Sequence, residues 1–220
     1  MSAASYASVI LDVDSTLSTV EGIEWLAARR GPEVLRDIRA VTERAMQGSV
    51  PLGAIFAERL ARIRPTRAEI EALGRAYVEG MTPGATELCR RLRDAGVRAI
   101  IVSGGLREAI LPLGGVLGIP AEDVHAVDIR FDAGGEYVSF NESSPLARNG
   151  GKPEVVRALD LARPLLAIGD GSTDLELRTS DPPAVDTFVA FTGVATRAPV
   201  VAAADHVIGS LTDLLDIVFP

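Results

Sequence analysis

Two aspartates that directly follow a short apolar run are the first residues whose spacing suggests chemistry. Residues 9–17 read VILDVDSTL, so one residue separates Asp12 from Asp14. Side chains at positions i and i+2 of an extended chain lie on the same side, and two carboxylates held there repel each other. A polar turn would use the same residue types. If both carboxylates face one cavity, a cation would relieve the repulsion, and the pattern therefore predicts a cation site.

Polar residues also follow two later apolar runs. The run at residues 99–102 leads into Ser103, and the run at residues 165–168 leads into a Gly-Asp-Gly turn. In α/β sheets ligands bind beyond the carboxyl ends of the strands, which is where these residues are expected to lie. The candidate residues at the three strand ends are Asp12, Asp14, Ser103, Gly104, Gly105, Asp170 and Asp174, and Lys152 precedes the third run.

Together these residue types favour a magnesium-assisted phosphate site. Carboxylate oxygens, in a chain with few histidines, suit Mg²⁺ better than zinc. Ser103 and the two glycine amides after it, placed at a helix start, would hold a phosphate group, and Lys152 would add a compact positive charge. With that charge neutralised, one carboxylate can attack phosphorus in line while a second carboxylic acid protonates the leaving alkoxide. Asp12 and Asp14 fit those two roles.

The three apolar runs are typical of strands that helices cover on both faces, because their apolar character is continuous rather than alternating. Helical periodicity at residues 82–96, 106–117 and 152–161 alternates with the runs. This alternation predicts an α/β fold with a Rossmann-like parallel sheet. Further strands are expected as a small hairpin from residues 124–131 and 137–140, and at residues 187–191 and 206–208.

The long segment between the first and second runs predicts an inserted helical cap. One crossover helix needs far fewer residues than the segment 12–98 contains. Thr66 and Glu69 form a capping-box pattern that opens one helix of this insertion. Three earlier helices are expected at residues 21–30, 32–47 and 52–63. The expected domains are a catalytic core at residues 1–17 and 80–220 and a helical cap at residues 18–79.

The composition argues against several classes of partner. The chain has 220 residues, 47% of them hydrophobic, and a formal net charge of -8, which suits one substantial core. Because no basic stripe is available to neutralise phosphates, neither nucleic acid nor a membrane is an expected partner. The single cysteine and the lack of an apolar leader or membrane-length run favour a cytoplasmic protein. We expect a monomer or homodimer that binds a small-molecule phosphomonoester.

Four short motifs resemble those of the haloacid dehalogenase (HAD) superfamily of phosphatases. They occur in the family's order and read DVDSTLS (12–18), IVSGG (101–105), GGKPEVV (150–156) and GDGSTD (169–174). More narrowly, VDSTLSTVEGIEWLA and AMQGSVPLGAIFAERLARI in the insertion are similar to phosphoserine phosphatases. The resemblance implies a HAD-like core with a cap, and Mg²⁺-dependent hydrolysis of phosphoserine through an aspartyl-phosphate.

The resemblance also implies a role for individual residues. Asp12 would be the nucleophile and Asp14 the acid/base, while Ser103 and Lys152 would hold the phosphoryl group. The implied Mg²⁺ ligands are Asp12, Asp14 through its carbonyl, and Asp170, supported by Asp174. The implied substrate-binding residues are Glu21, Met46, Arg59, Gly104, Gly105 and Thr173.

Several positions keep alternatives open. Leu52 stands where the family usually has phenylalanine, and Gln47 and Val127-Asp128 also depart from its common residues. Another small ester, such as phosphothreonine or phosphoethanolamine, is therefore an alternative substrate. A phospho-accepting switch module would use similar residues, although it would not explain the insertion. Arg197 matches an arginine near the site of close relatives.

Overall fold

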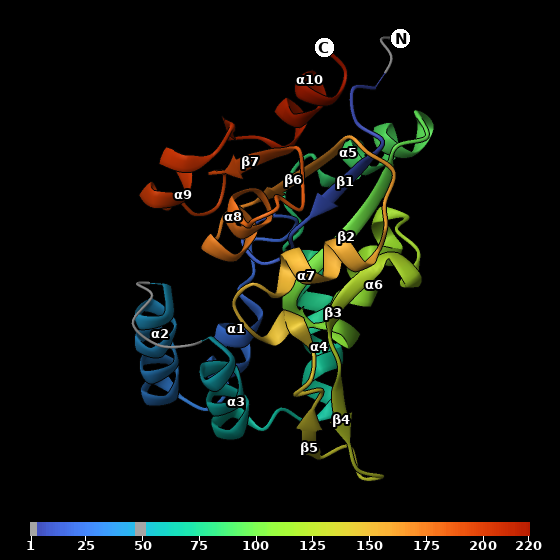
Figure 1. Cartoon of the computed structure of the whole chain (residues 1–220). Helices are drawn as coiled ribbons and strands as arrows, with labels where there is room; N and C mark the ends of the chain where they lie inside the picture. Colours follow the sequence, from blue (N-terminus) through green and yellow to red (C-terminus); the bar gives the residue numbers. More distant parts are fainter. Residues whose placement is uncertain (1–3, 47–51) are drawn as a thin grey trace.

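A six-stranded parallel sheet forms the centre of the computed structural model, which describes residues 4–46 and 52–220 (Figure 1). Of residues 42–46 and 52–54 it describes the backbone alone. The strand order is β3-β2-β1-β6-β7-β8. The strands are β1 (Ser8–Leu11), β2 (Arg98–Leu106), β3 (Val124–Val127), β6 (Leu165–Gly169), β7 (Thr187–Phe191) and β8 (His206–Ile208).

The register of the central strands sets the level at which the site begins. Leu11 pairs with Ile101 of β2 on one side and with Ile168 of β6 on the other. The pairing of β1 with both neighbours therefore ends at the same level, at the carboxyl-terminal edge of the sheet. Polar residues that follow these three positions are brought together there, as the sequence predicts.

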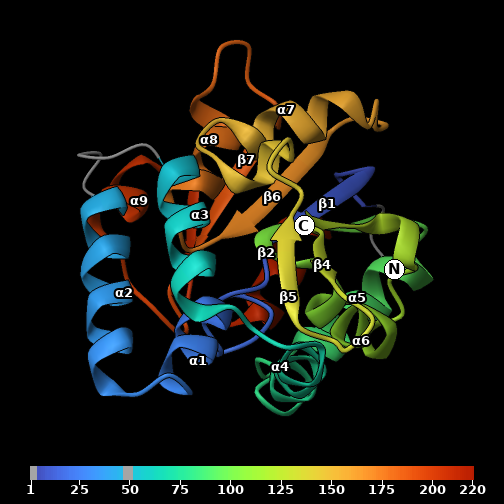
Figure 2. The same ribbon diagram turned by 90° about the horizontal axis from the view of Figure 1, so that it is seen from below.

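Helices cover both faces of the sheet, in agreement with the continuous apolar character of its strands. Figure 2 shows α7 and α8 on one face and α5 and α6 on the other. The flanking helices are α5 (Ala85–Asp94), α6 (Arg107–Leu117), α7 (Gly151–Ala158), α8 (Ser172–Thr179), α9 (Ala198–Ala203) and α10 (Leu214–Val218). In the described ranges, 4–46 and 52–220, no helix combines the length and the apolar character needed to cross a membrane.

The insertion after β1 consists of four helices in the described part of the chain: α1 (Gly22–Ala28), α2 (Pro32–Met46), α3 (Leu52–Ile63) and α4 (Arg67–Glu79). Of these, α2 and α3 stand apart from the helices that flank the sheet (Figure 1). The fourth helix packs against α6 and so connects the insertion to the core. The division into a cap at residues 18–79 and a core stays a prediction.

Two expected elements differ from the structure. Residues 124–131 do not form one strand: the chain bends at Asp128, so that β3 joins the main sheet while β4 (Ile129–Phe131) pairs antiparallel with β5 (Tyr137–Phe140). Ser103 and the two glycines after it do not lie at a helix start as expected, although the helix expected at residues 106–117 is present. Strand β2 continues through a register shift to Leu106, and α6 begins at Arg107, because two glycines let the strand bulge at this point.

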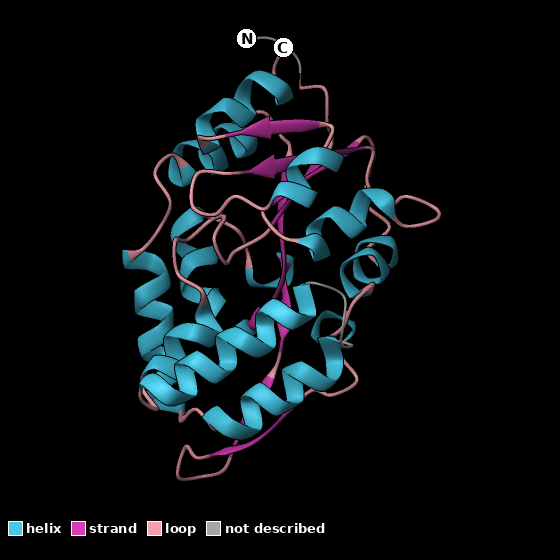
Figure 3. Ribbon diagram, turned by 90° about the vertical axis from the view of Figure 1, so that its left-hand side faces the viewer, coloured by secondary structure: helices cyan, strands magenta, loops and turns pink. Residues whose placement is uncertain are grey.

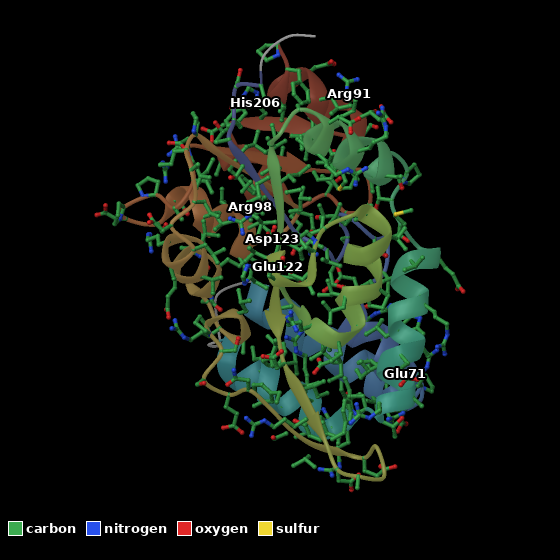
Figure 4. All side chains as sticks on the ribbon, turned by 90° about the vertical axis from the view of Figure 1, so that its right-hand side faces the viewer. Glu71, Arg91, Arg98, Glu122, Asp123 and His206 are labelled. Atoms are coloured by element: carbon green, nitrogen blue, oxygen red, sulfur yellow. The ribbon has the colours of Figure 1, made fainter. Side chains whose placement is uncertain are left out.

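The β4–β5 hairpin projects from the sheet and contacts the insertion (Figure 3). The Phe56 ring of α3 meets the Phe140 ring of β5 edge-on, with centroids 5.1 Å apart. The backbone amide of Arg67 donates to the Gly135 carbonyl over 2.8 Å. The hairpin therefore contacts the insertion both at α3 and at the start of α4. Arg98, at the start of β2, pairs with Asp123 before β3 (Figure 4).

A capping box begins α4, as the sequence predicts, and an arginine of the insertion completes it. The Thr66 hydroxyl accepts from the Glu69 amide, and Glu69 Oε2 accepts from the Thr66 amide over 2.8 Å. Both Glu69 oxygens also accept from the Arg30 guanidinium. The hydrogen bonds from Arg30 lower the pKa of Glu69 to about 2. Two segments of the insertion, the residues after α1 and the start of α4, are thereby joined at one carboxylate.

We expect Glu69→Gln to lower the free energy of unfolding by about 1–2 kcal/mol at pH 7, since a cap and a charged pair are both weakened. The pKa of Glu69 is lower in the folded state than its unfolded value of about 4.3. Its contribution to the free energy of unfolding is therefore complete above the unfolded pKa and is lost as the pH falls toward the folded-state pKa. Urea unfolding between pH 7 and pH 2.5 measures both effects. Glu71→Gln, exposed on the same helix (Figure 4), is the matched control. Equal pH dependence in the parent and Glu69→Gln would contradict the assignment.

Candidate active site

The predicted polar residues meet in one cavity of about 120 Å³ between the strand ends and the insertion. Those that line it are Asp12, Asp14, Glu21, Arg59, Ser103, Gly104, Lys152, Asp170, Thr173 and Asp174. Gly105 lies just behind the wall, where its amide donates to Ser103 Oγ over 3.0 Å. The Met46 side chain, Gln47 and the Leu52 side chain lie outside the described part of the chain.

Lys152 forms the ionic centre of the site. Its Nζ donates to Asp12 Oδ1 and to Asp174 Oδ1, both over 2.6 Å, and all three side chains are buried. The helix that carries Lys152 begins so close to the preceding segment that a Cβ on Gly151 would overlap the Pro145 carbonyl. Burial acts to lower the pKa of Lys152, but Asp12 and Asp174 outweigh it and raise the pKa above its usual value. The lysine therefore stays charged.

Asp174 has a structural position as well as an ionic one. Its Oδ2 accepts from the Gly171 amide over 3.0 Å and so caps the start of α8, as expected from the sequence. A Cβ on Gly169 would overlap the Asp174 side chain, so only glycine leaves room for it. Burial and the charge of Asp12 raise the pKa of Asp174 to about 7. Its position is thus fixed by the β6–α8 turn.

Asp14 is held by the insertion rather than by the core. Its Oδ1 accepts from the Gly22 amide of α1 over 2.9 Å and from the Tyr77 hydroxyl of α4 over 2.7 Å. Burial and the charge of Asp12 raise the pKa of Asp14 to about 6. Burial also raises the pKa of Tyr77 well above its usual value, so the hydroxyl stays protonated. The carboxyl group is suited to carry a proton near neutral pH.

Glu21 and Arg59 reach the cavity from different helices of the insertion. Glu21 precedes α1, and its Oε1 accepts from the Ser15 hydroxyl over 2.6 Å. Burial and the charge of Asp14 raise the pKa of Glu21 to about 7. Burial lowers the pKa of Arg59 on α3, against the attraction of Asp14 and Glu21. The insertion therefore presents both an acidic and a basic group to the same small cavity.

The cavity has more acidic than basic side chains. Six carboxyl groups line it, against Arg59, Lys152 and Arg197. Single carboxylate oxygens of Asp12, Asp170 and Asp174 lie within 4.8 Å of one another, and all three residues are buried. Burial and the charge of Asp12 raise the pKa of Asp170 to about 7. This crowding of hard oxygen donors fits a small divalent cation such as Mg²⁺.

Arg197 is placed at the site by the structure, although the sequence alone gave little reason to include it. Its Nε donates to Asp170 Oδ2 over 2.9 Å, and its Nη2 lies 3.7 Å from Glu21 Oε1. It precedes α9 and therefore comes from the end of the chain farthest from β1. The arginine links the core acid Asp170 to the insertion acid Glu21.

Further lining residues were not anticipated from the sequence. They are Ile23, Glu24, Phe56, Leu146 and Gly171. A signal existed for three of them: Ile23 and Glu24 closely follow Glu21, and Phe56 precedes Arg59 by one helical turn. Leu146 lies in an irregular segment before α7, where no periodicity identifies it.

Comparison with known proteins assigns the family. A family model described as haloacid dehalogenase-like hydrolase matches residues 9–177, which is most of the chain. The chain belongs to this family. The fold predicted from the alternating strands and helices, a Rossmann-like parallel sheet with flanking helices, is therefore confirmed for this haloacid dehalogenase-like hydrolase.

Relatives of this haloacid dehalogenase-like hydrolase cover nearly all of its length. It is 38% identical over 211 residues to the human phosphoserine phosphatase, covering 94% of this chain and 91% of the human one. It is 36% identical to the chloroplastic phosphoserine phosphatase of Arabidopsis thaliana, covering 96% of this chain and 72% of that protein. A crystal structure of a phosphoserine phosphohydrolase-like protein from Francisella tularensis superposes with a TM-score of 0.86 at 27% identity, covering 96% and 99% of the two chains.

We expect Gly169→Ala to reduce turnover by at least about 10-fold and to destabilise the fold by about 1–3 kcal/mol, because the added methyl displaces Asp174 and with it Lys152. Phosphatase assays and urea unfolding measure the two effects. Gly115→Ala is the control, since a Cβ there meets no atom within 4 Å on the exposed side of α6. That variant should match the parent or be slightly more stable. Full activity of Gly169→Ala would show that turnover does not depend on the position of Asp174.

Proposed function

We propose that this hydrolase converts O-phospho-L-serine and water to L-serine and phosphate. The observation that carries the proposal is the meeting of Arg59 and Glu21 with the phosphate-site residues in one small cavity. The serine part of the substrate presents one carboxylate and one ammonium group, which complement an arginine and a glutamate. Relatives named phosphoserine phosphatase, at 36–38% identity over most of the chain, support the same substrate.

The proposed reaction begins with Asp12 as the nucleophile. A carboxylate oxygen of Asp12 bonds to phosphorus while the bond from phosphorus to the seryl oxygen breaks, and the Asp14 carboxyl proton passes to that oxygen. Asp14 then accepts a proton from the water that attacks the aspartyl-phosphate, which releases phosphate and restores both carboxyl groups. Lys152, at 2.6 Å from Asp12, holds the nucleophile in place and offsets negative charge as phosphate approaches. Ser103, Gly104 and Thr173 are placed to bind phosphoryl oxygens from the cavity wall.

We further propose Mg²⁺ as the cofactor, held by Asp12 and Asp170 together with the Asp14 carbonyl. The carboxylate crowding around Asp12 supports the proposal, since closely spaced hard oxygen donors favour a bound divalent cation. When bound, Mg²⁺ neutralises phosphoryl charge and orients the phosphoryl group for in-line attack. Asp174 is then a supporting residue that keeps Lys152 beside the nucleophile.

Another small phosphomonoester, such as phosphothreonine or phosphoethanolamine, is the alternative substrate for the same site. Membership of a hydrolase family counts against a phospho-accepting switch module. A cytoplasmic location, a monomeric or dimeric state and the lack of nucleic-acid or membrane partners stay predictions.

Asp12→Asn should reduce turnover by more than about 1,000-fold while the protein still folds, because an amide cannot form the acyl-phosphate. Mass spectrometry of acid-quenched parent enzyme after brief exposure to phosphoserine should find phosphate on Asp12. The variant must be checked for deamidation. Normal turnover by undeamidated Asp12→Asn would exclude the proposed nucleophile.

Metal removal should abolish activity and lower the midpoint of thermal unfolding. Mg²⁺ that binds the folded chain stabilises it by about 2.7 kcal/mol at 100 times its dissociation constant, so the midpoint should rise on titration of stripped protein with MgCl₂. Asp170→Asn should weaken this response, whereas Glu71→Gln should retain it. Ca²⁺ should bind but support little turnover, because its higher and looser coordination would let Asp12 serve as a metal ligand instead of attacking phosphorus. Full activity in excess chelator would refute the cofactor.

The substrate assignment is tested by comparing esters in the parent and in Arg59→Ala. If Arg59 binds the carboxylate, kcat/KM for phosphoserine should fall by the equivalent of about 2–5 kcal/mol, or roughly 30-fold to several-thousand-fold. Phosphoethanolamine lacks the carboxylate, so it should be a poor substrate of the parent and lose little further. Arg62→Ala, an exposed arginine on the same helix, is the matched control.

Glu21→Gln provides the complementary test. It should lower kcat/KM for phosphoserine more than for phosphoglycolate, which keeps a carboxylate but lacks the ammonium group. Phosphothreonine completes the panel. Equal losses of kcat/KM on all esters would show that Arg59 and Glu21 are structural residues. If the parent enzyme prefers another ester of the panel, that ester replaces phosphoserine as the proposed substrate.

A further inference from the structure

A buried tyrosine of α4 contacts the proposed acid/base. Tyr77 is fully buried, and its hydroxyl donates to Asp14 Oδ1 over 2.7 Å although the two residues are 63 positions apart. The same oxygen accepts from the Gly22 amide over 2.9 Å. One carboxyl oxygen of Asp14 is therefore held from two helices of the insertion, and Oδ2 is the oxygen that remains to deliver a proton.

The space for this hydroxyl depends on the absence of a side chain at residue 22. A Cβ added to Gly22 would overlap the Tyr77 hydroxyl oxygen and lie 3.0 Å from the ring carbon that bears it. A phenylalanine at residue 77 would fill the ring site without a polar atom that needs a partner. The buried hydroxyl is thus accommodated at the start of α1 and is aimed at Asp14.

The end of α4 is fastened to the segment that carries Asp14. Ser18 Oγ lies 3.1 Å from both the Tyr77 and the Gly80 carbonyl oxygens, and the Thr19 amide donates to the Gly80 carbonyl over 2.8 Å. One turn earlier in α4, a Cβ on Gly74 would lie 3.1 Å from Pro112 of α6, so the helix packs closely on the core. These contacts fix the height and rotation of Tyr77 relative to Asp14.

We infer that Tyr77 is a positioning residue for proton transfer: with Gly22 it holds Oδ1 of Asp14, so that the acid proton resides on Oδ2 and is delivered to the leaving oxygen. This inference rests on the proposed function, in which Asp14 is the acid. In the step concerned, the bond between phosphorus and the ester oxygen breaks, the bond from phosphorus to Asp12 forms, and the Oδ2 proton moves to the departing alkoxide. Tyr77 loses no proton and contacts no substrate atom.

The test compares two substrates whose leaving groups differ in their need for a proton. The seryl alkoxide of phosphoserine departs only when protonated, whereas the acetate of acetyl phosphate departs unaided. Tyr77→Phe should lower kcat/KM for phosphoserine by about 10- to 100-fold, the range for losing one hydrogen bond to a carboxyl group. For acetyl phosphate the loss should stay below about 3-fold. The value of kcat/KM reports the first transfer and not the later hydrolysis.

Tyr6→Phe is the matched control variant. Tyr6 also donates or accepts a side-chain hydrogen bond, to Thr187 Oγ1 over 2.9 Å, but it lies at the other end of the sheet. It should leave both substrates within about 2-fold of the parent, as expected for a distant site. The ratio of the two kcat/KM values is independent of the folded fraction, so lower stability of Tyr77→Phe would not obscure the result.

An equal loss on phosphoserine and acetyl phosphate would overturn the inference and make Tyr77 a packing residue. A second measurement tests whether the effect of Tyr77→Phe on kcat/KM depends on the Asp14 carboxyl group. In an Asp14→Asn background, Tyr77→Phe should change kcat/KM for phosphoserine by less than about 2-fold, and a loss as large as in the parent would also overturn it. Inactivity of the parent on phosphoserine would count against the proposed substrate alone. The ratio is then measured with the alkyl ester of the panel that the parent hydrolyses.

Discussion

The buried contact of Lys152 with Asp12 and Asp174 is the interaction on which the rest of the site depends. Several carboxyl groups are collected at one sheet edge, and their mutual repulsion would favour protonation or an open structure. The lysine ammonium, at 2.6 Å from both carboxylates, offsets part of that repulsion inside the fold. Its position depends in turn on two glycines, Gly151 and Gly169, which admit the helix start and the Asp174 side chain. The position of the buried lysine charge therefore depends on the backbone at these two glycines.

The two proposed catalytic carboxyl groups are held in different ways. Asp12 is fixed by the core through Lys152, whereas Asp14 is fixed through Gly22 and Tyr77 of the insertion. The insertion therefore does more than cover the cavity, because one hydrogen-bonded carboxyl group belongs to both parts of the molecule. A displacement of α4 would therefore move the hydroxyl that holds Asp14, whereas the contact of Asp12 with Lys152 lies within the core.

Much of the site could be predicted from the sequence because parallel strands that end at one level bring distant motifs together. The capping box of α4 and the bounds of α3 were likewise set by local signals, Thr66 with Glu69 and an apolar stripe. Arg197 and Tyr77 could not be placed in this way, since a contact across many positions depends on how helices pack. The bend at Asp128 and the bulged end of β2 were missed for a related reason: which neighbour a strand chooses is a tertiary property.

The close approach of Gly22 and Tyr77 also constrains the order in which this sequence can change during evolution. While the hydroxyl of Tyr77 is present, a substitution at residue 22 meets a steric overlap. Loss of that hydroxyl relaxes the overlap, so a larger residue at 22 becomes accessible only after residue 77 has changed. On the way back the order is reversed, because residue 22 must return to glycine before a tyrosine fits at residue 77. Two positions on helices far apart in the chain can thus change only in a set order.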